Sequence, residues 1–200
     1  GPYPLDTSLI QGMGGMGTQF PALTEKLHRF IERQHMFFTA TATDTSRINL
    51  SPRSTDWFRV VDDNKVLYLD RTGSGNETAA HMLADGRMTI MFCAVDGPPQ
   101  ILRLYGKGHV FARGNDEYDG FLGQLFDGQE PKGARQMVVL DVEMVQSSCG
   151  FGVPFFDYKG ERDSMDRWAA DKQDEDFRDY WRQNNQSSLD GLPTGIPVDA

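Results

Sequence analysis

Short apolar runs of strand length, each bounded by turn residues, recur from residue 36 to residue 147. Few helical segments lie between these runs, and most of the connections are short turns rather than crossover helices. Strands joined in this way pair in antiparallel order, because parallel strands need long crossover connections. The expected strands are residues 36–42, 47–51, 58–61, 65–70, 87–94, 101–112 and 137–147. The pattern favours a mainly β (α+β) fold, an antiparallel barrel with peripheral helices.

Helical periodicity accompanies these strands in residues 24–34, 77–83 and 118–126. Residues 161–184 mix charges of both signs with isolated aromatic side chains, which predicts a peripheral helix that is broken near Asp171. Prolines and glycines then favour an extended end of the chain. We therefore expect residues 161–200 to form a C-terminal helix and an extended tail packed on the barrel.

Residues 1–17 are left out of the fold. Gly1 and Pro2 match what remains after a purification tag is cleaved, so this segment is interpreted as a tag, a linker or a flexible arm. Residues 12–17 match G-x-G-x-x-G, but no strand-like run precedes them. The dinucleotide fingerprint needs a strand before it and a helix opening inside it. We do not interpret these glycines as a nucleotide site.

The net charge of −9 limits the partners of this chain. Nucleic acid and anionic membranes repel an acidic protein, so neither is expected as a partner. Cys93 and Cys149 make no disulfide framework, which favours a cytoplasmic protein, and the histidines show no metal-site spacing. Cys149 is expected to be a small buried apolar residue, and a reactive thiol in its glycine-flanked loop is the alternative.

A strand, a loop of small residues and a helix follow one another between residues 67 and 83. The strand ends at Asp70, the loop spans residues 72–76, and Ser74 or Asn76 is expected to cap the helix that begins near Glu77. A helix N-terminus behind such a loop offers free backbone N–H groups and a partial positive charge. The segment predicts a phosphate site, and a capped helix without a ligand is the alternative.

Arginines lie on or beside several expected strands. Because the guanidinium group makes bidentate contacts with phosphate, their position near the loop favours an anionic ligand. Each one alone is better explained as an exposed strand residue or as the partner of a carboxylate. These arginines are Arg47, Arg53, Arg59, Arg71 and Arg103.

Over roughly residues 23–147 the chain resembles the pyridoxamine 5′-phosphate oxidase-like family of FMN-binding split barrels. Several motifs carry the resemblance together, although each alone is weak. They are Phe30–Phe38, Asn49–Arg53, Gly73–His81 and Ile101–Gly106, with Ser147–Pro154 and Asp190–Pro193 extending it toward the C-terminus. The resemblance implies a six-stranded split barrel over residues 18–160 that forms a homodimer with two FMN sites in its interface.

The same resemblance implies where the flavin lies. The end of the strand at residues 49–53 is expected along the flavin ring, and the loop at residues 70–76 is expected at the ribityl chain and phosphate. Arg103 is expected near the ring or near the partner subunit's ligand. The implied cofactor-binding residues are Asn49, Ser51, Arg53, Arg59, Asp70, Arg71, Thr72, Ser74, Asn76 and Arg103. No catalytic residue is assigned.

One departure from the oxidases narrows the function. They carry a Ser-Arg-Lys phosphate clamp where this chain has Ser74, Gly75 and Asn76, so Arg53, Arg59 or Arg71 would have to compensate. We therefore expect an FMN-dependent oxidoreductase that acts on a small molecule other than pyridoxamine phosphate. The alternatives are a flavin- or haem-binding sensor or store without robust turnover, and a cofactor-free binding module. A deazaflavin is a further alternative cofactor.

Overall fold

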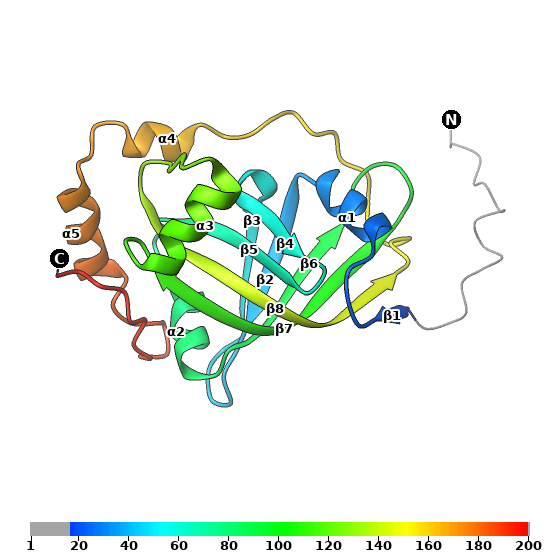
Figure 1. The fold of residues 1–200 in the computed structure, drawn as a ribbon, viewed down its shortest axis with the longest axis horizontal. Helices are drawn as coiled ribbons and strands as arrows, with labels where there is room; N and C mark the ends of the chain where they lie inside the picture. Colours follow the sequence, from blue (N-terminus) through cyan, green and yellow to red (C-terminus); the bar gives the residue numbers. More distant parts are fainter. Residues whose placement is uncertain (1–16, 200) are drawn as a thin grey trace.

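The computed structural model describes residues 17–199, and within them eight strands form one antiparallel sheet that curls into a barrel (Figure 1). The strands are β1 (Thr18–Phe20), β2 (Met36–Thr41), β3 (Asn49–Ser54), β4 (Phe58–Asp62), β5 (Lys65–Arg71), β6 (Arg87–Cys93), β7 (Ile101–Ala112) and β8 (Ala134–Ser148). The helices are α1 (Glu25–Glu32), α2 (Glu77–Ala84), α3 (Asp116–Phe126), α4 (Ser164–Ala169) and α5 (Asp174–Asn184). The antiparallel barrel with peripheral helices is confirmed.

The strand order is β3-β2-β6-β7-β8-β5-β4, and β1 pairs with β8 outside this path. The resemblance implied six strands, which is wrong for this chain. The pattern of apolar runs already accounts for the seven strands on the path, and β1 adds an eighth. This extra strand forms because β8 is 15 residues long and its pairs with β5 reach only to Asp141. Its far half is free to pair with β1, where Thr18 lies opposite Ser147.

β3 differs from its expected bounds because it continues through Pro52 to Ser54. Proline normally ends a strand, since it has no N–H to donate to the sheet. β3 lies at the edge of the sheet and pairs only with β2, where Pro52 is opposite Phe38. An edge strand has no neighbouring strand on one side, so the N–H that proline lacks interrupts no hydrogen bonds between strands on that side.

The barrel interior is filled by apolar side chains from α1 and from most of the strands. Thr24 caps α1 by accepting a hydrogen bond from the backbone N–H of Leu27. Aromatic rings at the centre lie 4.9–5.8 Å apart between their centroids. They belong to Phe37, Phe58, Tyr68 and Phe92. Phe37 and Phe92 are fully buried, so this cluster forms the centre of the barrel core.

A second apolar cluster lies on the outer face of β5 and β8, where α3 covers them. Leu67 and Leu69 of β5 and Met137 and Val139 of β8 belong to this cluster, whereas their neighbours face the barrel interior. Both faces of these strand segments are therefore buried. This explains why the sequence of β8 alternates only partly between apolar and polar residues.

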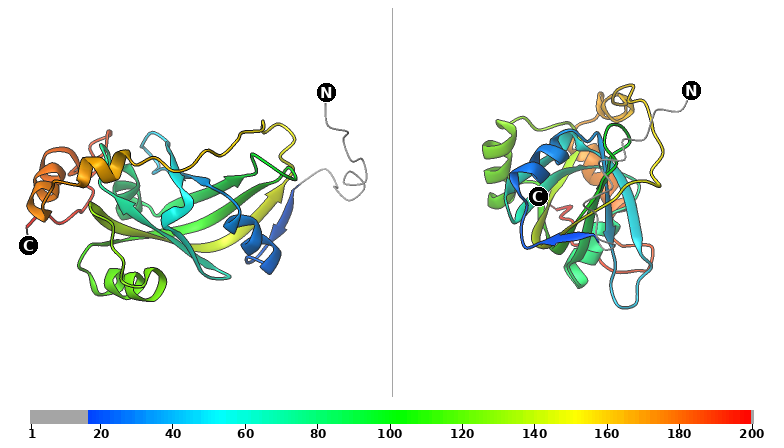
Figure 2. Two further views of the ribbon diagram at one scale, coloured as in Figure 1. Left: turned by 90° about the horizontal axis from the view of Figure 1, so that it is seen from above. Right: turned by 90° about the vertical axis from the view of Figure 1, so that its right-hand side faces the viewer.

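α4 and α5 lie at the end of the barrel opposite β1 (Figures 1 and 2). The expected break near Asp171 is confirmed, because α4 ends at Ala169 and α5 begins at Asp174. Phe177 and Trp181 of α5 are buried in a small cluster with Ala169 and Ile196. Within residues 17–199 no helix is both long and apolar enough to cross a membrane.

Cys149 was expected to be buried, and this expectation is wrong, because the side chain is exposed. It follows the last residue of β8, where the chain leaves the sheet. The neighbouring Gly150 is buried instead, with its Cα so close to Gln100 that an added Cβ would lie 2.7 Å from the Gln100 backbone nitrogen. The glycine makes the close approach at this turn, which leaves the cysteine on the outside.

Candidate functional site

A cavity of about 420 Å³ lies where β5 passes through its loop into α2, facing β3 and the start of β8. Small-molecule sites in proteins fall in this range of volumes. Most of the residues proposed from the sequence are brought together here, namely Asn49, Ser51, Arg53, Asp70, Arg71, Ser74 and Asn76. Pro52, Gly73, Gly75, Glu77, Thr78 and Arg135 complete the lining.

Three of the proposed residues lie elsewhere. The Arg59 Nε donates to the carbonyl of Leu125 at 3.1 Å, and its guanidinium lies over the Phe126 ring, 4.4 Å from the centroid. Arg103 Nη1 donates to Ser148 Oγ at 3.3 Å on the neighbouring strand. Thr72 is buried and does not line the cavity. The structure therefore separates these side chains from the cavity.

Asp70 is the charged centre beneath the cavity. It is 2% exposed, and its Oδ1 accepts from Arg53 Nη1 at 2.6 Å. Its Oδ2 accepts from Arg135 Nη2 at 2.7 Å and from Gln136 Nε2 at 2.8 Å. Burial alone would raise the pKa of Asp70, but the charges of both arginines and the hydrogen bonds from Arg135 and Gln136 lower it below its ordinary value. The carboxylate is therefore ionised and fixes both guanidinium groups.

Sequence reasoning missed Arg135 and Gln136. The last strand was expected to begin at Met137, whereas β8 begins at Ala134 and places Gln136 directly opposite Asp70. Arg135 is 3% exposed. The available signal was the pair of polar residues immediately before the apolar run, since such residues at a strand start can face a buried partner on the next strand.

Asn76 stands at the N-cap position of α2, but its side chain does not cap the helix, so the expected cap is wrong. Its Oδ1 accepts from Gln136 Nε2 at 2.8 Å instead. The amide is drawn toward β8 because the buried Gln136 needs an acceptor there. Asn76 Nδ2 is buried and has no hydrogen-bond partner among the described residues. A buried donor on the cavity lining without a partner is costly, which indicates that a ligand or water satisfies it.

The β3 side of the cavity is tied to α2 through Asn49. Its Nδ2 donates to Thr78 Oγ1 at 3.3 Å and to Thr41 Oγ1 at 3.2 Å, and its Oδ1 accepts from Ser51 at 3.3 Å. Thr41 Oγ1 lies 2.8 Å from Nδ1 of the buried His81. These contacts hold β3 and the first turn of α2 in a fixed relation.

The cavity lining is richer in positive charge than the chain as a whole. It contains three arginines and the two carboxylates of Asp70 and Glu77, in a protein of net charge −9. Arg71 also pairs with Asp166 of α4 at 2.8 Å. Within residues 17–199 no group of histidine, cysteine or acidic side chains is arranged to hold a metal ion. The lining therefore suits an anionic organic ligand.

A family model described as pyridoxamine 5′-phosphate oxidase matches residues 23–149. This chain belongs to that family. A relative from Aspergillus flavus, the pyridoxamine 5′-phosphate oxidase family protein ustO, is 35% identical over 190 residues, which is 87% of this chain and 76% of the relative.

Solved structures agree with the family assignment at the level of the fold. HupZ from Group A Streptococcus is 19% identical, with a TM-score of 0.50 over 61% of this chain and 91% of that chain. A putative pyridoxamine 5′-phosphate oxidase from Lactobacillus delbrueckii is 16% identical, with a TM-score of 0.50 over 65% of this chain and 98% of that chain. The split-barrel fold of this pyridoxamine 5′-phosphate oxidase family member is thus shared across distant sequences.

Proposed function

We propose that this member of the pyridoxamine 5′-phosphate oxidase family binds FMN in the cavity and acts as a flavin-dependent oxidoreductase on a small molecule. The observation that carries the proposal is the buried Asn76 Nδ2, which lies at the start of α2 on the cavity lining and has no partner among the described residues. A phosphate oxygen placed there would satisfy this donor. The backbone N–H groups of the first turn of α2 point to the same end of the helix.

The cations around the cavity support the phosphate assignment. The Ser-Arg-Lys clamp of the oxidases is missing from the loop, but Arg53, Arg71 and Arg135 line the cavity from β3, β5 and β8. Asp70 neutralises part of this charge and holds Arg53 and Arg135 in place before any ligand is present. The hydroxyl of Ser74 and the amide of Asn49 supply polar contacts suited to a ribityl chain.

The bound flavin would supply the redox chemistry, and the chain would supply binding and orientation. Arg53, Arg71 and Arg135 would hold the anionic end, while Asn49 and Ser51 of β3 would orient the remainder of the ligand. Among the described residues, the cavity lining contains no histidine, cysteine, methionine or tyrosine, the side chains that ligate haem iron. This composition favours FMN over haem.

The absorption spectrum of the purified protein with added FMN tests the proposal. We expect flavin bands that remain after gel filtration, and reduction of the bound flavin by NADH or NADPH would support an oxidoreductase. A Soret band would replace FMN with haem. A protein that takes up neither would overturn both cofactor proposals and leave a binding module.

Replacing Arg53 with alanine is expected to weaken FMN binding about tenfold or more, because one charge-assisted contact to the ligand is lost. The fold should survive, since Asp70 keeps its bonds to Arg135 and Gln136. Arg59→Ala is the matched control, because Arg59 lies on the next strand but outside the cavity. Titrations monitored by flavin fluorescence measure both variants. Equal FMN affinity in Arg53→Ala and the wild type would contradict the role of Arg53.

We also propose that the protein is a homodimer. Exposed apolar side chains on β2 and β3 support this, with Met36 42% and Leu50 64% exposed. Burial of such side chains against a second copy removes apolar surface from water. Light scattering during gel filtration should give twice the chain mass of 22.5 kDa, and Leu50→Glu should shift the population toward the monomer. A monomeric wild type at micromolar concentration would contradict the homodimer.

A further inference from the structure

The C-terminal segment, defined here as residues 174–198, contacts the loop that lines the cavity, residues 72–76. It contacts the chain at Thr72 before the loop glycines, at Gly73 itself, and at Glu77 after them. Trp181 Nε1 donates to Thr72 Oγ1 at 2.9 Å, and Thr72 in turn donates to the carbonyl of Gly133 at 2.9 Å. The backbone N–H of Leu189 donates to Glu77 Oε1 at 2.8 Å on the first residue of α2. The two ends of the loop are therefore both held by this segment, across 109 and 112 residues of sequence.

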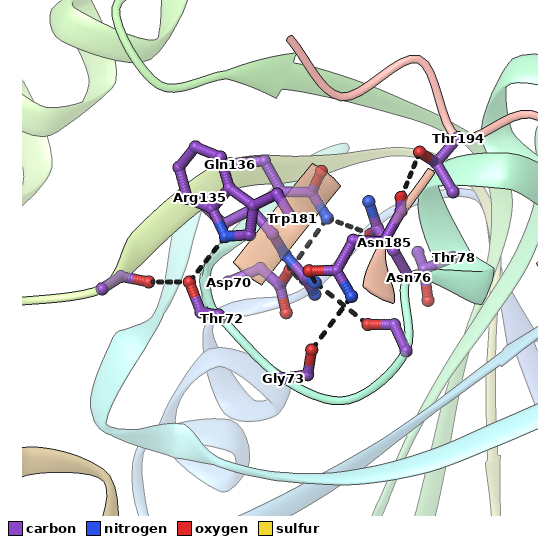
Figure 3. Close-up of polar contacts among 12 residues, drawn as sticks. Asp70, Thr72, Gly73, Asn76, Thr78, Arg135, Gln136, Trp181, Asn185 and Thr194 are labelled. Carbon is purple, nitrogen blue, oxygen red and sulfur yellow. Dashed lines mark hydrogen bonds and ion pairs between the residues drawn. The ribbon is translucent and has the colours of Figure 1, made fainter. Parts of the chain in front are cut away.

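Asn185 holds the middle of the loop (Figure 3). Its Nδ2 donates to the carbonyl of Gly73 at 3.1 Å, and its Oδ1 accepts from Arg135 Nη1 at 3.0 Å. The same Nη1 donates to the carbonyl of Gly75 at 3.0 Å. Both glycine carbonyls are thus fixed through one amide and the guanidinium that it contacts. Asn185 itself is fully buried, and the two glycines that it helps to fix lie on the cavity lining.

Asn185 is itself held in place by its own backbone. Its N–H donates to the carbonyl of Trp181 at 2.9 Å, and its carbonyl accepts from Thr194 Oγ1 at 2.6 Å. Thr194 is also buried. The side chain amide therefore comes from a rigid point just after α5, which is what a positioning group requires.

Side-chain packing does not fix the two glycines in the middle of the loop. A Cβ added at Gly73 or Gly75 would meet no atom within 4 Å, so side-chain packing does not restrain these positions. Glycine backbones lose the most conformational freedom on ordering. A loop that is already ordered loses less freedom when a ligand binds, and the affinity for that ligand rises accordingly.

We propose that Asn185 is a positioning residue that fixes the glycine loop for the phosphate of the ligand. The inference rests on the proposed binding of FMN and deepens it, because it assigns the C-terminal segment to the phosphate end of the cavity. The selectivity for FMN over riboflavin, which lacks the phosphate, should depend on Asn185.

The experiment compares Asn185→Ala and Asn185→Asp with Asn184→Ala as a matched control. Asn184 is the adjacent amide, but it is exposed and donates only to the Tyr180 carbonyl of its own helix. Asn185→Asp keeps the acceptor for Arg135 and loses the donor to Gly73, so it preserves the fold if the alanine variant does not. Dissociation constants for FMN and riboflavin are measured by fluorescence titration, and hydrogen exchange of the loop amides is measured without ligand.

Both Asn185 variants are expected to bind FMN about tenfold or more weakly, whereas riboflavin binding should change by less than roughly threefold. The amides of residues 73–77 should exchange faster without ligand, while those of β7 keep the wild-type rate. Equal losses for both flavins, or unchanged exchange in the loop, would overturn the inference. If the wild type binds neither flavin, the proposed function fails, and the exchange rates of the ligand-free protein alone then decide whether Asn185 fixes the loop.

Discussion

Replacing Asp70 with asparagine is expected to lower the free energy of unfolding at pH 7 by about 3–5 kcal/mol. The carboxylate is 2% exposed and Arg135 is 3% exposed, so the substitution leaves a buried guanidinium without its charge partner. Urea denaturation monitored by tryptophan fluorescence measures the loss. Asp44→Asn is the control, because Asp44 pairs with Arg87 at the surface, where such pairs contribute little. A loss no larger than that of the control would contradict the buried network.

The same carboxylate determines a pH dependence. Its pKa in the folded protein is lowered from the ordinary value of 3.8, so the unfolded chain takes up a proton at a higher pH than the folded one. The stability from this group is therefore present above pH 3.8 and is lost as the pH falls below it. Acid titrations of the folded fraction should show a shallower decline in Asp70→Asn than in the wild type.

Replacing Gly106 with alanine is expected to destabilise the fold by about 3 kcal/mol or more, because the new methyl group has no space. Gly106 lies at the point where the register of β7 on β8 shifts, and an added Cβ would lie 1.9 Å from the carbonyl oxygen of Asp141. This oxygen belongs to the backbone of β8, the strand that lies between β7 and β5 in the sheet. Relief of the clash therefore requires movement of β8 itself.

Gly108→Ala is the matched comparison two residues along β7. Its added Cβ would meet the sulfur of Met82 at 2.2 Å, and a flexible side chain can move aside. We expect a smaller loss, of about 1–2 kcal/mol. Thermal and urea unfolding of the two variants measure the difference. Equal stabilities would show that the bulge at Gly106 adapts more easily than its geometry indicates.

The strand pattern could be predicted because alternation and turn residues are local signals. β4 and β6 begin at the expected residues, Phe58 and Arg87, because their composition and the turn residues beside them are signals in the local sequence. The start of β8 could not be found in this way. Arg135 and Gln136 are polar residues buried by partners on β5, and their burial depends on contacts 65 and 66 residues away.

The candidate site was predicted in part, through the family resemblance. Short motifs at residues 49–53 and 73–81 carry that resemblance, which implied that Asn49, Arg53 and Asn76 belong to one site, and the structure brings these residues to one cavity. The direction of the Asn76 amide was not predictable. Its oxygen could cap α2 or accept from Gln136, and in the structure it accepts from the buried Gln136. Asn185 lies 112 residues from Gly73, so no local pattern connects them.

The pairing of β8 with three strands, β1, β5 and β7, has a consequence for synthesis on the ribosome. β8 pairs with β5 and β7 and is the only link between β3-β2-β6-β7 and β5-β4 on the path through residues 17–199. Until residue 148 has left the ribosomal exit tunnel, the nascent chain holds two partial sheets with open edges. Open edges invite pairing with other chains, so we expect the nascent chain to be most prone to such pairing before β8 closes the sheet.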